Sequence, residues 1–318
     1  MDYHEFIQAK RHSIGNQGFD PVWMPDKAFD FQQEIISRIV KKGRVGLFAD
    51  TGLGKTLMQL AFAYNVVKKT NKRVLILTPL AVAFQFIKEA ETVGIDDICH
   101  TKDGKFSKSI VICNYERLHL LDPADFEAVL LDESSILKNF DGKTKEQIIG
   151  FIKRVRYRLL STATPSPNDF IELGNSSEAL GYMGYMDMLG KFFRSNQNSV
   201  DSNNRNIGEK FYLKPHAEKD FFAWVNQWSI MVKRPSDMGF SNEGYDLPAL
   251  HTNSHMVYNR EAWVADGQAA LFAMPAKTMT EVRAEQKKTV NERCERAIEL
   301  AAGKTSVYWC NLNEESAL

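Results

Sequence analysis

Cysteine is scarce in this sequence and never paired. The four cysteines are spread over 318 residues, none stands in a CxxC pair, and the seven histidines show no ligand-like spacing. A disulfide framework and a zinc module both need such clusters, so neither is expected. Unpaired cysteines of this kind fit a reducing cytosol. The cysteines are Cys99, Cys113, Cys294 and Cys310.

Long hydrophobic runs and an excess of one charge are also missing. No window reaches the roughly 18 apolar residues that a membrane helix needs, and the first residues, MDYHEFIQAKRH, contain no apolar signal segment. Forty Lys and Arg residues balance 40 Asp and Glu residues, so any surface for nucleic acid must be local. We therefore predict a soluble, cytoplasmic protein, in a bacterium or a phage-infected host, with no membrane partner and room for two domains.

The most informative segment is ADTGLGKT, at residues 49–56. It follows the apolar run RVGLFAD and precedes the helical pattern LMQLAFAYNVVKK. A glycine-rich turn between a strand and a helix directs backbone N–H groups at phosphates, and Lys55 adds a positive charge. The hydroxyl of Thr56 would bind Mg²⁺. Ala49 replaces the first glycine of the strict Walker A pattern, but the strand–turn–helix context predicts a site for a nucleoside triphosphate.

Five short, nearly all-apolar runs alternate with amphipathic helical patterns between residues 44 and 164. Continuous apolar strands are typical of a parallel sheet covered on both faces, so an α/β fold is predicted. Ligands on such sheets bind at the carboxyl ends of the strands, and each run ends in polar residues. The runs are RVGLFAD, RVLILTP, SIVICNY, AVLLDES and YRLLSTATP, which begin at residues 44, 73, 109, 128 and 157.

Asp132 and Glu133 lie at the end of the fourth run. In sites that cleave phosphate bonds, one carboxylate holds Mg²⁺ and a second positions and deprotonates the attacking water. An isolated Asp-Glu pair is more often a solvated acidic turn. Here the pair lies beyond a phosphate loop in an alternating β/α sequence, and adjacent carboxylates beside an apolar core are costly without a cation. The catalytic interpretation is therefore favoured.

The segments ADTGLGKT, LDESS and STATP stand in the order of motifs I, II and III of superfamily-two helicases, which the sequence resembles. It is most similar to the Swi/Snf-like branch, and particularly to the compact DEAD/DEAH-type helicases of bacteriophages. FDFQQ resembles the glutamine motif, LILTPLAVAFQFIKEA resembles motif Ia and ICNYERL resembles motif Ib. The connector KRPSDMGF…LPAL is similar to the phage branch. DESS replaces the usual DEAD or DEAH, but the Asp-Glu pair is intact.

The resemblance implies a role for each matching residue of the ATP site. Lys55, Asp132 and Glu133 would be catalytic, with Glu133 as the general base. Thr56 and Asp132 would hold Mg²⁺, and Gln32 would contact adenine. The predicted ATP-binding residues are Gln32, Thr51, Gly52, Leu53, Gly54, Lys55 and Thr56.

The resemblance also implies residues that face nucleic acid or connect it to ATP. The segment STATP would couple the ATP site to the nucleic-acid groove, and motifs Ia and Ib would face the backbone of the bound strand. The predicted coupling residues are Thr162, Ala163 and Thr164. The predicted nucleic-acid residues are Thr78, Pro79 and Tyr115.

A RecA-like phosphate-loop domain, with a parallel sheet flanked by helices, follows from the resemblance. We predict this first lobe at residues 1–167, a helical insertion and connector at 168–250, and a linker helix with the first strand of an incomplete second lobe at 251–318. The strand is expected at SVYWCNL, residues 306–312, after one charged helix over about 278–302. No later segment matches motifs V and VI, so a second lobe or a partner protein would have to supply an arginine finger, and turnover without it should be poor.

Two classes of function stay open. The first is an ATP-driven motor that uses Mg²⁺, a DNA helicase or duplex translocase, and the Swi/Snf likeness favours duplex DNA over RNA. The second is a nucleotide-dependent module that binds ATP and DNA without efficient turnover. Another phosphate-loop enzyme, such as a small-molecule kinase, is disfavoured by STATP and by the lack of a second-substrate signature.

Other conspicuous residues are better explained by packing or solvation. Trp224 and Trp228 lie four residues apart on a predicted helix with apolar neighbours at the same spacing, which favours core packing over base stacking. Lys and Arg alternate with Glu over residues 278–304, as on a solvated helix face. The Asn/Ser-rich run that starts at Arg194 is predicted to be a mobile loop.

Overall fold

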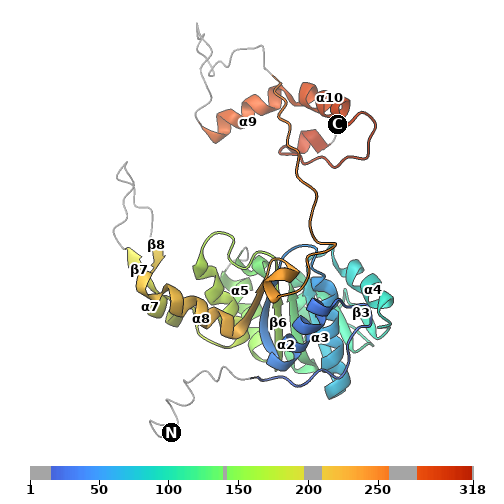
Figure 1. The fold of residues 1–318 in the computed structure, drawn as a ribbon, viewed down its shortest axis with the longest axis vertical. Coiled ribbons are helices and arrows are strands. Elements are labelled where there is room, and N and C mark those ends of the chain that lie inside the picture. The colour runs from blue at the N-terminus through green and yellow to red at the C-terminus, as the bar shows by residue number, and fades with distance from the viewer. Residues whose placement is uncertain (1–15, 139–141, 197–209, 258–277, 317–318) are drawn as a thin grey trace. The chain divides into compact units, whose positions relative to one another are not determined.

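The computed structural model describes residues 16–138, 142–196, 210–257 and 278–316 (Figure 1). The chain divides into two compact units, Met1–Asp246 and Leu247–Leu318. Most of the predicted Asn/Ser-rich loop, residues 197–206, lies outside the described residues. None of the helices in the described ranges combines the length and apolar character needed to cross a membrane.

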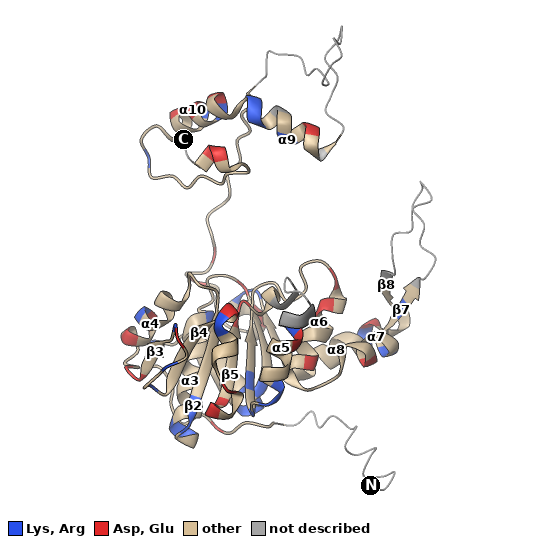
Figure 2. Ribbon diagram, turned by 180° about the vertical axis from the view of Figure 1, so that it is seen from behind, with Lys and Arg blue, Asp and Glu red and all other residues tan. Residues whose placement is uncertain are grey.

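Seven parallel strands form the central sheet of the first unit, in the order β3-β4-β2-β5-β6-β1-β9. The five predicted apolar runs form the inner strands, which confirms the α/β prediction. These strands are buried because helices cover both faces of the sheet. In agreement, Figure 2 shows the charged residues mostly on helices and at strand ends. The inner strands are β1 (Arg44–Ala49), β2 (Arg73–Thr78), β4 (Ile110–Asn114), β5 (Phe126–Asp132) and β6 (Tyr157–Ser161).

The sequence patterns did not predict the two edge strands, β3 (Ile98–His100) and β9 (Ser229–Val232). Both are short, and β9 begins directly after a helix, so neither has a run of its own long enough to be distinguished. β9 pairs with β1 in parallel, and the N–H of Asp50 donates a 2.9 Å hydrogen bond to the carbonyl of Val232. The connector that starts at Lys233 therefore begins beside the predicted phosphate loop.

Three helices cover one face of the sheet: α2 (Asp30–Lys42), α3 (Lys55–Thr70) and α4 (Ala83–Thr92). Their apolar residues and one side of the strands form a continuous core. Asn71, with φ +55°, ends α3 in the left-handed conformation that asparagine tolerates. This core fixes the start of α3 against the end of β1, where the phosphate loop lies.

The other face is covered by α5 (Gly142–Lys153), α6 (Leu173–Leu180), α7 (Tyr185–Phe192) and α8 (Glu218–Trp228). Trp224 and Trp228 of α8 are 6% and 0% exposed, and their rings meet edge to face with centroids 5.4 Å apart. This confirms that they pack in the core. Residues 168–246 of the predicted helical insertion and connector belong to the first unit. A hairpin of β7 (Phe193–Asn196) and β8 (Lys210–Leu213) lies between α7 and α8 in the chain.

The second unit differs from the sequence prediction in two respects. The single charged helix expected over 278–302 is two helices, α9 (Met279–Lys288) and α10 (Val290–Ala301), because the chain leaves helical geometry at Thr289. The strand expected at 306–312 does not form in this part of the chain, so that prediction was wrong. A strand needs a partner for its backbone hydrogen bonds, and the described residues of this unit provide none.

Candidate functional site

The predicted phosphate loop connects β1 to α3. Gly52 and Gly54 have φ angles of +83° and +80°, a conformation that glycine adopts without the steric cost of a Cβ. Gly54 is the residue before α3, so the helix begins at Lys55. The Nζ of Lys55 donates hydrogen bonds to the carbonyl oxygens of Ala49 (3.0 Å) and Asp50 (3.1 Å). The loop thus curls around its own lysine at the positive end of the helix dipole.

Gln32 supports this loop from α2. Its side chain is 4% exposed, its Nε2 donates a 3.0 Å hydrogen bond to the carbonyl of Leu53, and its Oε1 accepts one of 3.0 Å from the N–H of Phe29. A Cβ added to Gly54 would lie 2.4 Å from the Gln32 Nε2, so a side chain at position 54 would displace the Gln32 amide. The structure thus shows Gln32 holding the loop backbone, and its contact with adenine stays a prediction.

Asp132 lies at the end of β5 and is 7% exposed. Its Oδ1 accepts a 2.8 Å hydrogen bond from Gln59 Nε2, and its Oδ2 accepts one of 3.2 Å from Thr78 Oγ1. Burial raises the pKa of Asp132 and the charge of Glu133 adds to this, whereas the two hydrogen bonds and Lys55 lower it. Burial outweighs the opposing contacts, so a divalent cation would stabilise the charged carboxylate.

Glu133 follows in a turn with φ +50°, an uncommon conformation for a residue other than glycine. Its Oε2 accepts a 3.0 Å hydrogen bond from the hydroxyl of Thr162. The Oγ1 of Thr162 in turn accepts a 3.1 Å hydrogen bond from the N–H of Thr164. Backbone strain of this kind concentrates at functional sites. The predicted coupling segment, with Ala163 at its centre, is therefore hydrogen-bonded to the predicted general base.

The three predicted nucleic-acid residues differ in accessibility. Thr78 and Tyr115 are 0% and 3% exposed, whereas Pro79 is half-buried. The hydroxyl of Tyr115 donates a 2.7 Å hydrogen bond to the backbone carbonyl of Asp132, and burial together with the Asp132 charge raises the Tyr115 pKa well above its usual value. Thr78 and Tyr115 thus support Asp132 from the protein interior. Their direct contact with nucleic acid stays a prediction.

The residues predicted to hold Mg²⁺ come from α3 and β5. Thr56, the second residue of α3, offers a hydroxyl and Asp132 a carboxylate. Mg²⁺ is usually bound by one or two protein oxygens beside phosphates and keeps several waters, so this donor set fits it. Among the described residues, no group of three or more His, Cys, Asp or Glu side chains could hold a metal without such help.

Sequence reasoning missed Gln59, which binds Asp132 directly. The side chain is 0% exposed and lies on α3 between the buried residues Met58 and Leu60. The available signal was a polar residue within an apolar helical stretch, one turn after Lys55. Such a residue needs a hydrogen-bond partner, although the sequence alone does not identify which one.

A cavity of about 310 Å³ adjoins the phosphate loop at the ends of β1 and β9. Its lining includes Asp50, Ala163, Lys233 and Asp237, so the first residue after β1, the coupling segment and the connector meet around one space.

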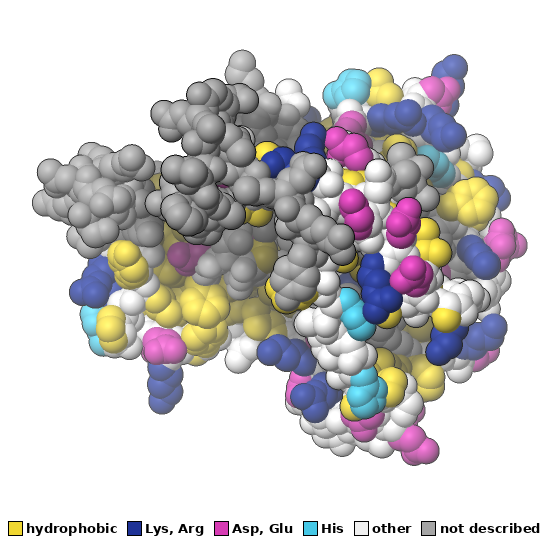
Figure 3. All heavy atoms as spheres, turned by 90° about the horizontal axis from the view of Figure 1, so that it is seen from above, with side chains coloured by type: hydrophobic (Ala, Val, Ile, Leu, Met, Phe, Trp, Pro, Cys, Tyr) yellow, Lys and Arg dark blue, Asp and Glu magenta, His cyan; other side chains and the backbone are white. Residues whose placement is uncertain are grey.

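The face shown in Figure 3 carries interspersed acidic and basic side chains, in line with the zero net charge. Any attraction for a polyanion is therefore local.

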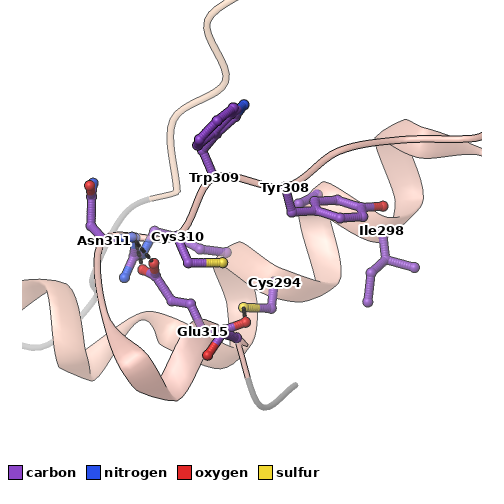
Figure 4. Close-up of a pocket in the computed structure, with 10 residues that line it drawn as sticks. Cys294, Ile298, Tyr308, Trp309, Cys310, Asn311 and Glu315 are labelled. Atoms are coloured by element: carbon purple, nitrogen blue, oxygen red, sulfur yellow. Dashed lines mark hydrogen bonds and ion pairs between the residues drawn. The ribbon is translucent and has the colours of Figure 1, made fainter. Parts of the chain in front are cut away.

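The second unit has a pocket of its own, of about 560 Å³ (Figure 4). Cys294 and Ile298 of α10 line it together with Tyr308 and Cys310 of the segment that follows the helix. Trp309, in the same segment, is 93% exposed. None of the predicted site residues lines this pocket, so the chemistry is assigned to the first unit.

Comparison with known proteins identifies relatives of the region that holds the site. Residues 29–172 match the family model of the DEAD/DEAH box helicases. The chain is 25% identical over 196 residues to the uncharacterized ATP-dependent helicase YqhH of Bacillus subtilis, which covers 57% of this chain and 35% of that protein. It is 25% identical over 154 residues to the SWI/SNF-related matrix-associated actin-dependent regulator of chromatin subfamily A-like protein 1 of Xenopus laevis, covering 45% and 16%.

A solved structure shares the fold. The SWI2/SNF2 ATPase core of Sulfolobus solfataricus in complex with dsDNA superposes with a TM-score of 0.51 at 18% identity, covering 67% of this chain and 46% of that chain. The region matched by the family model includes the phosphate loop, Asp132, Glu133 and residues 162–164. The chain spans about a third of the length of the Bacillus relative.

Proposed function

We propose that this chain is the ATP-binding part of a motor that acts on duplex DNA. The motor is a superfamily-two, Swi/Snf-like protein, and residues 29–172 form its DEAD/DEAH box helicase domain. Its sheet and helices have the predicted RecA-like fold. The observation that carries the proposal is the hydrogen bonding of two adjacent carboxylates. Asp132 is bound to the phosphate-loop helix through Gln59, and Glu133 is bound to the coupling segment through Thr162.

ATP would bind with its phosphates on the loop between β1 and α3. The backbone N–H groups of this loop and the first turn of α3 are suited to phosphate oxygens. Lys55 would exchange its carbonyl partners, Ala49 and Asp50, for oxygens of the β- and γ-phosphates. Gln32 would preserve the loop conformation that makes this possible, because it holds the carbonyl of Leu53.

Thr56 and Asp132 would hold Mg²⁺, directly or through water. The ion, when bound, would neutralise charge on the β- and γ-phosphates. Glu133 would orient a water molecule towards the γ-phosphate and accept its proton. The hydrogen bond from Thr162 would keep the Glu133 carboxylate in one orientation, so hydrolysis would depend on the position of the coupling segment.

Duplex DNA is the proposed partner because the matching Sulfolobus structure contains dsDNA. The surface directly after β2 would face the DNA. There Pro79 is half-buried, and Leu80 and Phe84 are 67% and 82% exposed.

An arginine finger from a second lobe or a partner protein would complete the ATP site, and its contribution to phosphoryl transfer is on the order of a thousandfold or more.

The proposal is tested by the linkage between ATP and DNA in the variant Glu133→Gln, which should bind ATP without hydrolysing it. Fluorescence anisotropy would measure the affinity for a labelled DNA duplex with Mg–ATP, with Mg–ADP and without nucleotide. We expect Mg–ATP to change the DNA affinity by about fivefold or more, since a motor must couple its two sites. Lys55→Ala should abolish the effect.

Identical DNA affinities in all three states, despite ATP binding verified with a fluorescent ATP analogue, would contradict a motor. A labelled RNA duplex serves as the comparison for substrate class, and tighter ATP-linked binding to it would reassign the partner.

A further inference from the structure

Two buried amide side chains on α3 differ in how they are satisfied. Asn65 and Gln59 are both 0% exposed. The Oδ1 of Asn65 accepts hydrogen bonds from the N–H groups of Val22 (2.8 Å) and Trp23 (2.9 Å), and its Nδ2 donates to the carbonyls of Trp23 and Ala61, both at 2.8 Å. Every hydrogen-bonding position of Asn65 is used, so its role is to fix the N-terminal segment to α3.

Gln59 is only half satisfied. Its Nε2 donates the 2.8 Å hydrogen bond to Asp132 Oδ1, but its Oε1 is buried and has no partner in the described structure. Leaving a buried carbonyl oxygen unpaired costs about 1–3 kcal/mol. Both amide atoms are bonded to one carbon, so this oxygen lies in the immediate surroundings of the Asp132 carboxylate. A hydrogen-bond donor bound beside Asp132 is a candidate partner for it.

The position of Gln59 on α3 places it with the phosphate-binding residues. It follows Lys55 by four residues, so the two lie on the same face of the helix. The two proposed Mg²⁺ residues are also close to Gln59. Thr56 lies on the same helix, and Asp132 is hydrogen-bonded to Gln59. Water molecules on Mg²⁺ are hydrogen-bond donors, and the ion keeps several of them when it binds beside phosphates.

We propose that Gln59 is a positioning residue of the Mg²⁺ site. Its Nε2 fixes the orientation of the Asp132 carboxylate, and its Oε1 accepts a hydrogen bond from a water of the hydrated ion. The inference rests on the proposed function, because it requires that Mg²⁺ and nucleotide bind here. A carboxamide suits both tasks, since its N–H₂ donates to the carboxylate while its oxygen accepts from water. Partners of this kind tune metal affinity without contacting the metal.

The test is equilibrium binding of mant-ATP, a fluorescent ATP analogue, in excess Mg²⁺ and in excess EDTA. The ratio of the two dissociation constants gives the gain in affinity due to the metal. Gln59→Leu removes both polar atoms at similar volume, and Gln59→Met is a second apolar variant if the first does not fold. Asn65→Ala is the matched control, a buried amide on the same helix with no contact to Asp132.

In the Gln59 variants we expect the ratio of the two dissociation constants, which measures the metal-dependent gain in affinity, to fall about tenfold. Their affinity for mant-ATP in EDTA should be unchanged. Asn65→Ala should lower the melting temperature and leave the metal-dependent gain intact. An unchanged gain in Gln59→Leu or Gln59→Met, measured on folded protein, would overturn the inference alone. A wild-type chain with no metal-dependent gain at all would contradict the proposed function, and the role of Gln59 with it.

Discussion

The hydroxyl of Thr162 donates a 3.0 Å hydrogen bond to the Oε2 of Glu133, across the ends of two neighbouring strands. The two residues lie 29 positions apart in the chain, and the pairing of β5 with β6 brings them together. Thr162 also accepts the N–H of Thr164, so one hydroxyl connects the backbone of the coupling segment to the proposed base. A shift of this segment would therefore change the orientation of the Glu133 carboxylate.

Thr162→Val should lower kcat for ATP by about tenfold with little change in KM, because it removes one hydrogen bond, worth about 1.5 kcal/mol, that orients the base. Steady-state kinetics would measure both constants. Thr101→Val is the matched control, since Thr101 is 2% exposed and its Oγ1 has no partner among the described residues. Equal losses in the two variants would show that the effect is not specific to Glu133.

Gly54→Ala should abolish tight ATP binding. The added Cβ would lie 2.4 Å from the Gln32 Nε2, at a φ of +80° that alanine rarely adopts. Gly150→Ala is the control within the same unit, because Gly150 lies in α5 with nothing within 4 Å of a new Cβ. That change should stabilise the fold by about 0.5–1 kcal/mol in thermal denaturation. Normal ATP affinity in Gly54→Ala would contradict the loop geometry.

Gln32→Ala separates two roles that the same residue could have. If Gln32 acts by holding the carbonyl of Leu53, the substitution should weaken binding of ATP and GTP by similar factors. If it reads adenine, only ATP should be affected. The structure shows the first contact, so we expect binding of both nucleotides to weaken; a further loss specific to ATP would show that Gln32 also contacts adenine. Competition binding with each nucleotide would distinguish the two roles. Gln33→Ala is the control, because it loses only a side-chain hydrogen bond to the carbonyl of Ala28.

Asp132→Asn should raise the melting temperature at neutral pH while removing Mg²⁺-dependent ATP binding. Burial raises the folded-state pKa of Asp132 above its ordinary value of 3.8. Between these two pKa values the folded protein binds more protons than the unfolded one, so stability falls as pH rises through this window. At neutral pH the cost of the buried charge is fully present, and Asn removes it. The advantage should shrink as the pH falls through this window and be absent below the ordinary value. A variant less stable than wild type at neutral pH would refute this explanation.

The central strands and the phosphate loop could be predicted because each leaves a local signal. A parallel strand buried on both faces is a continuous apolar run, as in residues 74–77, and a loop that needs left-handed backbone carries glycines at 52 and 54. β9 left no such signal. It has four residues, lies at the sheet edge and leaves Met231 41% exposed. Tertiary pairing with β1 defines it.

The contacts that orient the site could not be predicted from local patterns. Gln59 and Asp132 are separated by 73 residues, and only the packing of α3 against the sheet brings their side chains together. Tyr115 matched a motif expected to face nucleic acid, yet its hydroxyl points to the carbonyl of Asp132. The opposite failure occurred at residues 306–312, where the sequence has a strand pattern but the described residues of the same unit contain no strand to pair with it.

The most direct test of the account is single-turnover hydrolysis of ATP by wild type and Glu133→Gln, with and without duplex DNA. Single-turnover conditions detect hydrolysis even when the chemical step is slow. We predict hydrolysis that DNA accelerates and that Glu133→Gln lowers by about a hundredfold or more. Equal rates for wild type and variant, whether or not DNA is present, would contradict the assignment of Glu133 as the base and of this chain as the ATP-binding part of a motor.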